Sequence, residues 1–295
     1  MVNKKINVLI LGGSGFLGSH VADELTNRNY NVTIYDRVKS SWKQKKQKLI
    51  LGNLTEYKKL SKIIKKNQIV YNFAGISDLA EGLNQPIETI KKNILANAEI
   101  MEICIKSNIK RFVYASSIYV HSEKGSFYKC SKQAAENYII EYSKIKNLKY
   151  TILRFGSLFG PRSNYNNGLY KIIYDFFKTK QLSYFGTKKT LRKYIYVKDA
   201  AKVCVDALSN KYNNSIIEIT GKKNISLFKV LKILANILNT NTKLVFKNLD
   251  NPNHYEKTPY TFKPKYGIKC YSKINTNFKK AIKELSEDIK KKINA

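Results

Sequence analysis

The sequence predicts an α/β fold in which a doubly wound parallel sheet is followed by a smaller mixed α/β lobe. Two observations lead to this prediction. Short apolar runs alternate with segments of helical period over the first half of the 295 residues, and this alternation is typical of parallel sheets covered by helices. The apolar content of 43% is enough to fill one such domain and a second, smaller lobe.

The individual elements follow from the same periodicity. Strands are expected to begin near Ile6, Asn31, Leu49, Ile69, Arg111 and Tyr150. Helices are expected near residues 16–28, 55–66, 87–107 and 128–146. Ligands of such sheets bind at the carboxyl ends of the strands, so the residues that follow each strand are the first candidates for function.

A polar stretch from Ser163 to Gly168 marks a crossing between two parts of the chain. We expect residues 1–165 to form the first domain and residues 166–295 to form the second lobe, with residues 193–212 returning to the first domain. The Lys-rich terminal helix would complete the second lobe.

A glycine-rich turn follows the first predicted strand. It consists of Gly12, Gly13, Ser14, Gly15, Phe16, Leu17 and Gly18. Glycine lets the backbone turn tightly and approach a pyrophosphate, and the helix start that follows offers free N–H groups. The spacing of Gly12, Gly15 and Gly18 is the wider variant of a dinucleotide-binding fingerprint, so this turn predicts a bound dinucleotide.

The second predicted strand ends at Asp36. A carboxylate at this position can accept hydrogen bonds from both ribose hydroxyls of NAD, and it would repel the 2′-phosphate of NADP. Arg37 follows it and could attract that phosphate. The position of the carboxylate favours NAD as the cofactor.

A proton-transfer site is predicted from Ser117, Tyr128 and Lys132. Tyr128 and Lys132 are four residues apart and therefore share one helix face. A nearby ammonium favours the phenolate and lowers the pKa of a phenol toward neutral pH. The hydroxyl of Ser117, which closes an apolar strand, can bridge that phenol and a substrate hydroxyl. Such a trio suits removal of a proton from an alcohol while a hydride leaves its carbon.

With these motifs in this order, the chain resembles the NAD-dependent epimerase/dehydratase branch of the extended short-chain dehydrogenases, which act mainly on nucleotide sugars, as UDP-glucose 4-epimerase-like enzymes do. The resemblance also rests on segments 51–55, 72–75, 111–117, 153–162 and 192–199. It implies a Rossmann-like first domain, a nucleotide-sugar substrate, and a homodimer formed by helices 94–107 and 128–146.

The resemblance also implies roles for further residues. Contacts with NAD are expected from Asn53, Leu54, Phe73, Ala74, Gly75, Asn93 and Phe155, together with Tyr128 and Lys132. Contacts with the substrate are expected from Ser77, Ser117, Tyr119, Ser157, Asn166, Asn167 and Arg192. Ser157 stands where the family often has Asn, and turn residues are the alternative for Asn166 and Asn167.

Departures from the family pattern narrow the reaction. The 4,6-dehydratases carry an Asp-Glu pair after the catalytic Ser or Thr, and the decarboxylases carry a Glu at the second of these positions. Ile118 and Tyr119 occupy both places here, and neither can act as a carboxylate acid or base. Ile118 and Arg162 likewise replace the Cys and His of the 3,5-epimerase/reductases. What remains fits a C4 epimerase, a C4 dehydrogenase or a ketoreductase.

The connection from Ser117 to Tyr128 is shorter than the family usually has. A more open sugar site could admit a larger sugar, such as the heptose of a GDP-heptose-like precursor of surface polysaccharide. Two alternatives stay open. One is a 4,6-dehydratase or ketoreductase with unorthodox acid–base groups, for which Glu123 is the close candidate. The other is a non-catalytic protein that senses NAD, although such proteins usually lose the Tyr or Lys.

Composition argues against several other classes of function. The net charge is +33, but 48 of the 54 basic residues are Lys spread along the chain, and Lys reads bases poorly. A nucleic-acid partner is therefore not expected. The four Cys and three His form no metal-ligand spacing, so no metal is expected. The N-terminus lacks a signal-peptide core and no apolar run is long enough for a membrane span, so a cytoplasmic enzyme is expected.

Overall fold

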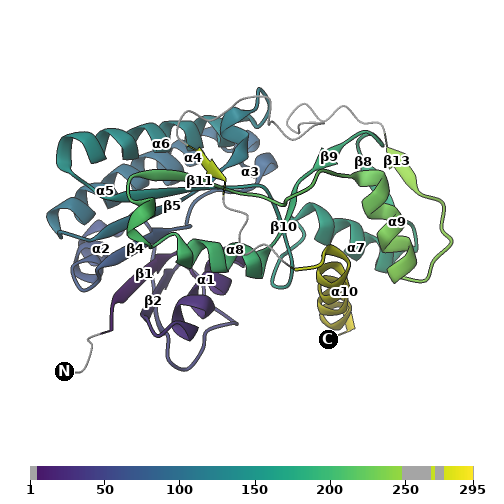
Figure 1. Ribbon diagram of the computed structural model, residues 1–295, viewed down its shortest axis with the longest axis horizontal. Coiled ribbons are helices and arrows are strands. Elements are labelled where there is room, and N and C mark those ends of the chain that lie inside the picture. Colours follow the sequence, from purple (N-terminus) through teal and green to yellow (C-terminus); the bar gives the residue numbers. More distant parts are fainter. Residues whose placement is uncertain (1–4, 248–266, 270–275, 295) are drawn as a thin grey trace.

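The computed structural model describes residues 5–247, 267–269 and 276–294 (Figure 1). Its main sheet has eight strands, in the order β14-β11-β6-β5-β4-β1-β2-β3, and each of its strand pairs is parallel. The strands are β1 (Asn7–Leu11), β2 (Asn31–Asp36), β3 (Lys48–Leu51), β4 (Ile69–Asn72), β5 (Arg111–Ser117), β6 (Tyr150–Phe155), β11 (Ser215–Ile219) and β14 (Gly267–Lys269). The order reverses between β1 and β4, which makes the sheet doubly wound.

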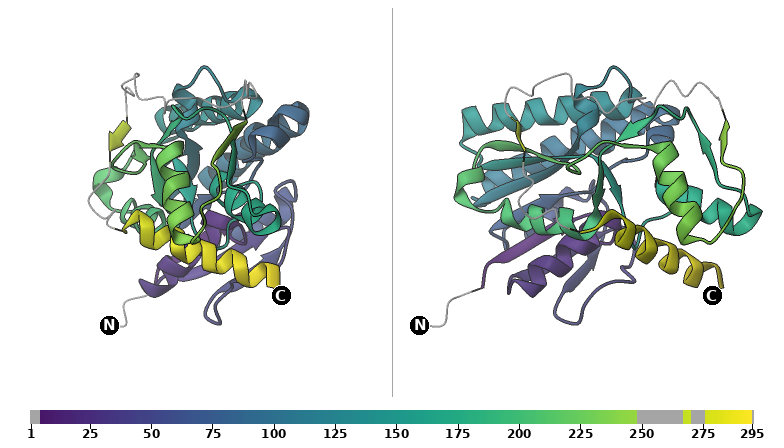
Figure 2. Two further views of the ribbon diagram at one scale, coloured as in Figure 1. Left: turned by 90° about the vertical axis from the view of Figure 1, so that its right-hand side faces the viewer. Right: turned by 45° about the vertical axis from the view of Figure 1, so that its right-hand side comes forward.

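Helices cover both faces of this sheet, as Figures 1 and 2 show. One face packs against α1 (Phe16–Asn27) and α8 (Val197–Asp206), whose apolar residues join the core through Val21, Leu25 and Val203. The other face packs against α2 (Tyr57–Ile64), α5 (Ala96–Lys106) and α6 (Ser126–Lys146). The expected α/β fold class is therefore confirmed.

The second lobe lies beyond the carboxyl ends of the main strands, on the right of Figure 1. It has its own apolar core, built by α7 (Gly168–Thr179), α9 (Leu227–Ile237) and α10 (Phe278–Asn294). Three two-stranded sheets complete it: β7 (Ser157–Phe159) with β10 (Tyr194–Tyr196), β9 (Leu191–Arg192) with β12 (Ile225–Ser226), and β8 (Ser183–Phe185) with β13 (Val245–Lys247).

Two features differ from the sequence prediction. The segment 87–107 is not one α-helix: α4 (Pro86–Thr89) is followed by a π-helical turn, η1 (Ile90–Leu95), and then by α5. A short helix, α3 (Leu79–Asn84), precedes it. In addition, β11 and β14 extend the main sheet, although both fall in the range 166–295 that was assigned to the second lobe. The pairing of β11 with β6 is a long-range contact that local periodicity cannot reveal.

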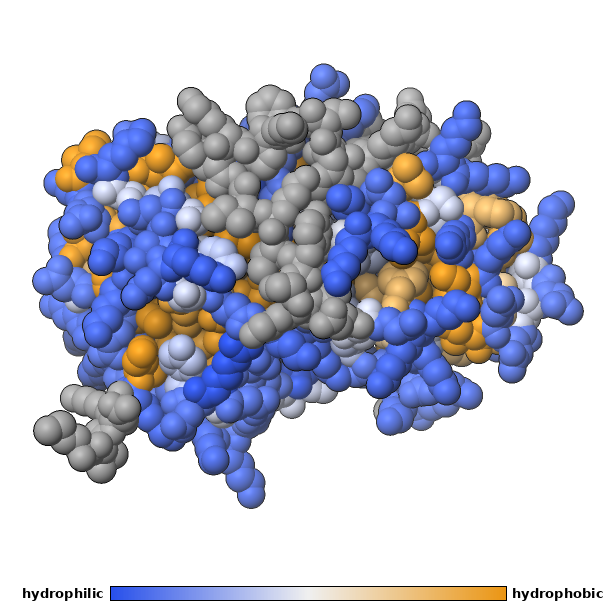
Figure 3. All heavy atoms as spheres, viewed as in Figure 1, coloured by the Kyte–Doolittle hydropathy of each residue, from blue (hydrophilic) through white to orange (hydrophobic). Residues whose placement is uncertain are grey.

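The surface is dominated by polar side chains. On the face drawn in Figure 3, hydrophilic residues cover most of the coloured area, with separate apolar areas between them. None of the described helices combines the length and the apolar character that a membrane span requires.

Candidate active site

The carboxyl ends of the parallel strands bring the predicted site residues to one edge of the sheet. The glycine-rich turn follows β1, Asp36 ends β2, Ser117 ends β5 and Phe155 ends β6. Ser117 and Phe155 are register partners on neighbouring strands. The edge therefore gathers residues that are far apart in the sequence.

The glycine-rich turn fits a pyrophosphate by its shape. Gly12 has φ +80° and its amide donates to the carbonyl of Tyr35 at 2.9 Å. A Cβ on Gly12 would lie 2.7 Å from the amide nitrogen of Ala74, and one on Gly18 would lie 2.2 Å from the carbonyl oxygen of Gly12. The first turn of α1 contains no acidic residue and no side chain caps its N-terminus. The N–H groups of this turn therefore remain suitable for an anion.

The carboxylate of Asp36 lies directly beside this turn. It accepts hydrogen bonds from the backbone amides of Ser14 at 2.9 Å and of Val38 at 3.3 Å, one on each oxygen. Each oxygen keeps a second lone pair for a ribose hydroxyl. Arg37 is exposed. At the neighbouring strand end, the hydroxyl of Tyr35 donates to the carbonyl of Asn53 at 2.8 Å, and Leu54 packs against the core.

Asn93 connects the loop after β4 with the helix that carries Tyr128. It lies in the π-helical turn, where its amide accepts from the backbone of Ile76 and donates to the carbonyl of the same residue. Its nitrogen also donates to the hydroxyl of Ser131 in α6 at 2.9 Å. Gly75, at φ +133°, leaves room for this side chain, because a Cβ there would lie 2.4 Å from the amide oxygen. Asn93 thus holds the loop 73–76 against α6.

The structure brings Tyr128 and Lys132 together in a buried environment. The ammonium of Lys132 donates to the carbonyl of Ala115 at 2.8 Å and to the hydroxyl of Tyr114 at 3.3 Å. It also lies over the ring of Tyr128, 5.7 Å from the centroid. Burial lowers the pKa of Lys132 to about 8, and the carboxylate of Glu136 acts in the opposite direction. The ammonium of Lys132 therefore holds its proton less firmly than that of an exposed lysine.

Ser117 lies at the end of the neighbouring strand, where its hydroxyl oxygen accepts from the backbone amide of Tyr119 at 3.3 Å. That bond uses a lone pair, so it does not consume the hydroxyl proton. The short connection to α6 then forms one turn, η2 (Ile118–His121), and places the ring of Tyr119 edge-on to that of Tyr128, 6.2 Å between centroids. Gly125, at φ +112°, permits this arrangement.

The remaining predicted substrate residues are more dispersed. Ser77 and Asn166 are exposed, and Ser157 is half-buried in β7. The amide of Asn167 caps α7 by accepting from the amide of Tyr170 at 3.2 Å and also donates to the carbonyl of Leu158 at 2.7 Å. The guanidinium of Arg192 is buried and donates to the carbonyl of Leu191. The roles of these residues at a substrate remain predictions.

A buried polar cluster near Lys132 was not expected from the sequence. Its members are Ser116, His121, Glu136, Arg154 and Glu218. One signal was available, since Glu136 follows Lys132 by four residues and therefore shares its helix face. The other members come from separate strands and loops and lack a local pattern.

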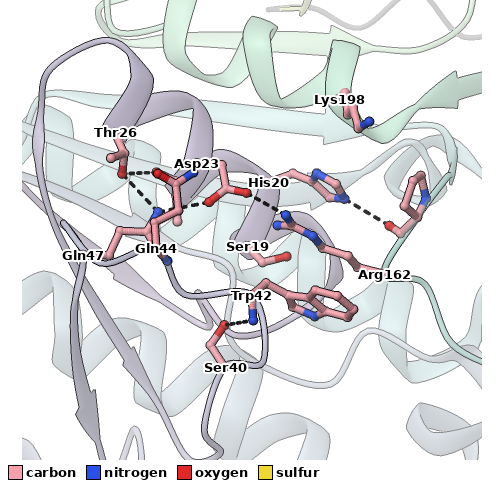
Figure 4. Close-up of polar contacts among 12 residues, drawn as sticks. Ser19, His20, Asp23, Thr26, Ser40, Trp42, Gln44, Gln47, Arg162 and Lys198 are labelled. Atoms are coloured by element: carbon pink, nitrogen blue, oxygen red, sulfur yellow. Dashed lines mark hydrogen bonds and ion pairs between the residues drawn. The ribbon is translucent and has the colours of Figure 1, made fainter. Parts of the chain in front are cut away.

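The segment that leads from β7 into the second lobe contacts α1, as Figure 4 shows. Arg162, at φ +65°, forms an ion pair with Asp23 at 2.7 Å, and its guanidinium lies 5.2 Å from the ring centroid of Trp42. The imidazole of His20 donates to the carbonyl of Pro161 at 3.0 Å. Burial lowers the pKa of His20 to about 4. Within the described residues, His, Cys, Asp and Glu side chains form no group that could hold a metal ion.

Known proteins resemble this chain in both sequence and structure. A family model described as "NAD dependent epimerase/dehydratase family" matches residues 8–220. A UDP-N-acetyl-alpha-D-glucosaminuronate decarboxylase of Bacillus cytotoxicus is 25% identical and covers 95% of this chain and 96% of its own. A putative UDP-glucose 4-epimerase of Methanocaldococcus jannaschii is 28% identical and covers 76% of this chain and 81% of its own.

Solved structures share the fold. A UDP-glucose 4-epimerase of Thermotoga maritima, crystallised with UDP-glucose, has a TM-score of 0.85 at 21% identity and covers 98% of this chain and 100% of its own. A UDP-glucuronic acid 4-epimerase of Bacillus cereus, in complex with UDP-glucuronic acid and NAD, has a TM-score of 0.85 at 20% identity and covers 97% of this chain and 99% of its own.

Proposed function

We propose that this chain, which belongs to the NAD-dependent epimerase/dehydratase family and is an NAD-dependent enzyme, acts on the C4 hydroxyl of a nucleotide-activated sugar. The observation that carries the proposal is the buried ammonium of Lys132 beside the ring of Tyr128, at the strand edge that Ser117 closes. These groups form a site for moving one proton to and from an alcohol.

Tyr128, Lys132 and Ser117 have different roles in the proposed proton transfer. Tyr128, as phenolate, accepts the proton of the sugar hydroxyl, and Lys132 stabilises that phenolate by its charge. The hydroxyl of Ser117 donates a hydrogen bond to the sugar oxygen and keeps it oriented. Bound NAD supplies the hydride acceptor. The glycine-rich turn would hold its pyrophosphate and Asp36 would bind its adenosine ribose, while Asn93 keeps the loop 73–76 in place against α6.

An epimerase or a dehydrogenase fits this set of groups better than a dehydratase or a decarboxylase. The positions 118 and 119, next to Ser117, carry Ile and Tyr and supply no carboxylate to remove water. The relatives named as 4-epimerases agree with this choice. The relative named as a decarboxylase keeps that activity among the outcomes to be tested.

The nucleotide and the sugar of the substrate can be proposed more specifically. The relatives named above carry UDP in their names, so UDP-sugars are the first candidates. The connection between Ser117 and α6, which contains the single turn η2, is short. A short connection would leave the sugar site more open, which favours a larger sugar such as a GDP-linked heptose. Such a sugar would be a building block of a surface polysaccharide.

We also propose that the enzyme is a homodimer that pairs through α5 and α6. Apolar side chains are exposed in and next to these helices: Leu95 by 52%, Tyr138 by 51% and Ile145 by 72%. Sedimentation equilibrium should give twice the chain mass, and the variant Ile145→Glu should shift it toward the monomer. No nucleic-acid or membrane partner is proposed.

The function is tested by mass spectrometry of UDP-, GDP-, dTDP- and CDP-linked sugars after incubation with the protein and NAD. An unchanged mass with a new chromatographic position supports an epimerase. A product lighter by two hydrogens, with NADH formed, supports a dehydrogenase. Loss of water or of carbon dioxide would contradict the interpretation of Ile118 and Tyr119. A protein that binds NAD but converts no sugar would instead favour an NAD sensor.

A further inference from the structure

Five buried polar side chains form a continuous network directly behind Lys132. Ser116, Arg154 and Glu218 are register partners on the neighbouring strands β5, β6 and β11, so they form a row across the sheet. Glu136 reaches this row from α6, one helical turn after Lys132. His121, at the end of η2, completes the network.

Arg154 and Glu136 form the centre of the network. The guanidinium of Arg154 donates to both carboxylate oxygens of Glu136, through Nε at 2.9 Å and through a terminal nitrogen at 2.5 Å. The hydroxyl of Ser116 donates to the same carboxylate. Both side chains of the pair are at least nine-tenths buried. A bidentate pair with this geometry fixes α6 against the ends of β5 and β6.

The network continues away from Lys132. Arg154 donates to the imidazole of His121 at 2.9 Å, and that imidazole lies 3.5 Å from a carboxylate oxygen of Glu218. The titratable groups that act on Lys132 are Tyr114 from β5 and Tyr128 and Glu136 from α6, and Arg154 from β6 is bound to Glu136. His121 and Glu218 form the outer layer beyond Arg154.

We propose that Glu136 and Arg154 are positioning residues for Lys132: the pair fixes the helix face that carries it and, as two opposed charges, sets how firmly Lys132 holds its proton. The inference rests on the proposed function, because it concerns the ammonium that supports Tyr128.

The physical basis is the weak screening between buried charges. In the intact pair, the carboxylate of Glu136 favours the ammonium of Lys132, and the guanidinium of Arg154 that is bound to this carboxylate offsets part of its effect. The variant Glu136→Gln leaves the guanidinium unpaired and thus disfavours the ammonium. The variant Arg154→Met leaves the carboxylate unpaired and thus favours it. The two variants should therefore move the pKa of Lys132 in opposite directions, which general loosening of the structure would not do.

The test is a pH titration of the full-length protein with bound NAD, labelled with [ε-¹³C]lysine and followed by NMR. Exposed lysines titrate at about 10.4, so the signal of Lys132, with a midpoint about two pH units lower, can be distinguished from theirs. Its absence in Lys132→Arg assigns it. We expect Glu136→Gln to lower this midpoint by about one unit and Arg154→Met to raise it by about one unit. Glu141→Gln, an exposed change on the same helix, should leave it unchanged.

Shifts in the same direction, or no shift in either variant, would overturn the proposal. Breaking a buried pair destabilises a protein by about 3–5 kcal/mol, so folding is checked first by circular dichroism. If a single variant does not fold, the double variant Glu136→Gln/Arg154→Met leaves no unpaired charge, and its midpoint should lie closer to the wild-type midpoint than that of the single variant that folds; a midpoint that is no closer contradicts the proposal. The titration needs no substrate, so a failure to convert any sugar would refute the proposed function without deciding this inference.

Discussion

The two lobes use their polar side chains in different ways. At the strand edge of the first lobe, the N-terminus of α1 has no side-chain cap, and Ser117 and Asp36 accept backbone hydrogen bonds without using their full capacity. In the second lobe, the side-chain amide of Asn167 uses both its oxygen and its nitrogen in hydrogen bonds, with the backbone of Tyr170 in α7 and with the carbonyl of Leu158. Polar groups of the first lobe thus keep hydrogen-bonding capacity for a ligand, whereas this polar residue of the second lobe maintains local structure.

The largest effect should come from the first lobe. Tyr128→Phe removes the proposed base, so kcat should fall by about 10²–10⁴-fold while the affinity for NAD stays the same. Turnover of the substrate identified from the sugar panel and calorimetric titration with NAD measure the two quantities. Tyr138→Phe, an exposed change on the same helix, serves as the control. Equal losses in both variants would argue against a catalytic Tyr128.

The next effect concerns the boundary between the lobes. The pKa of His20 is lowered from 6.5 to about 4 by burial, so the unfolded chain binds more protons than the folded one between these values. Stability should therefore decrease as the pH falls from about 6.5 to 4, by at most about 3 kcal/mol from this group. Urea unfolding of His20→Gln should show a weaker dependence over this window. An identical dependence would exclude His20 as its source.

A smaller effect is expected at the cofactor turn. In Gly18→Ala the new Cβ would lie 2.2 Å from the carbonyl oxygen of Gly12, so the turn must shift. We expect a loss of about 2 kcal/mol in NAD binding, or about thirtyfold in Kd. Gly168→Ala is the matched control in the second lobe, because its Cβ would meet no atom within 4 Å. Unaltered NAD affinity in Gly18→Ala would place the pyrophosphate elsewhere.

The smallest effect tests the second lobe. Asn167→Ala removes the N-cap of α7, so the free energy of unfolding should fall by about 1 kcal/mol while KM for the sugar changes little. Thermal unfolding and steady-state kinetics measure both. A raised KM without loss of stability would identify Asn167 as a substrate contact. It would contradict the view that this residue of the second lobe serves local structure alone.

The sequence predicts those parts of the molecule that depend on local spacing. The glycine-rich turn, the six strands from β1 to β6 and the helical spacing of Tyr128 and Lys132 are of this kind, and the structure has them at the expected places. The bonds of Arg154 to Glu136 and the pairing of β11 with β6 join segments that are far apart in the chain. The π-helical turn at Asn93 differs from an α-helix by a single backbone register, which apolar periodicity does not detect.

Figure 4 draws the side chain of Trp42 beside that of Arg162. Trp42 is the single tryptophan of the chain, and it belongs to the segment that follows Asp36. Its ring lies 5.2 Å from the guanidinium of Arg162 and 5.6 Å from the ammonium of Lys292 in α10. Its fluorescence therefore comes from one place, where the first lobe contacts α10. The emission of Trp42 can therefore be used without a label: a change in emission on adding NAD or a sugar would report a change at the contact between the first lobe and α10.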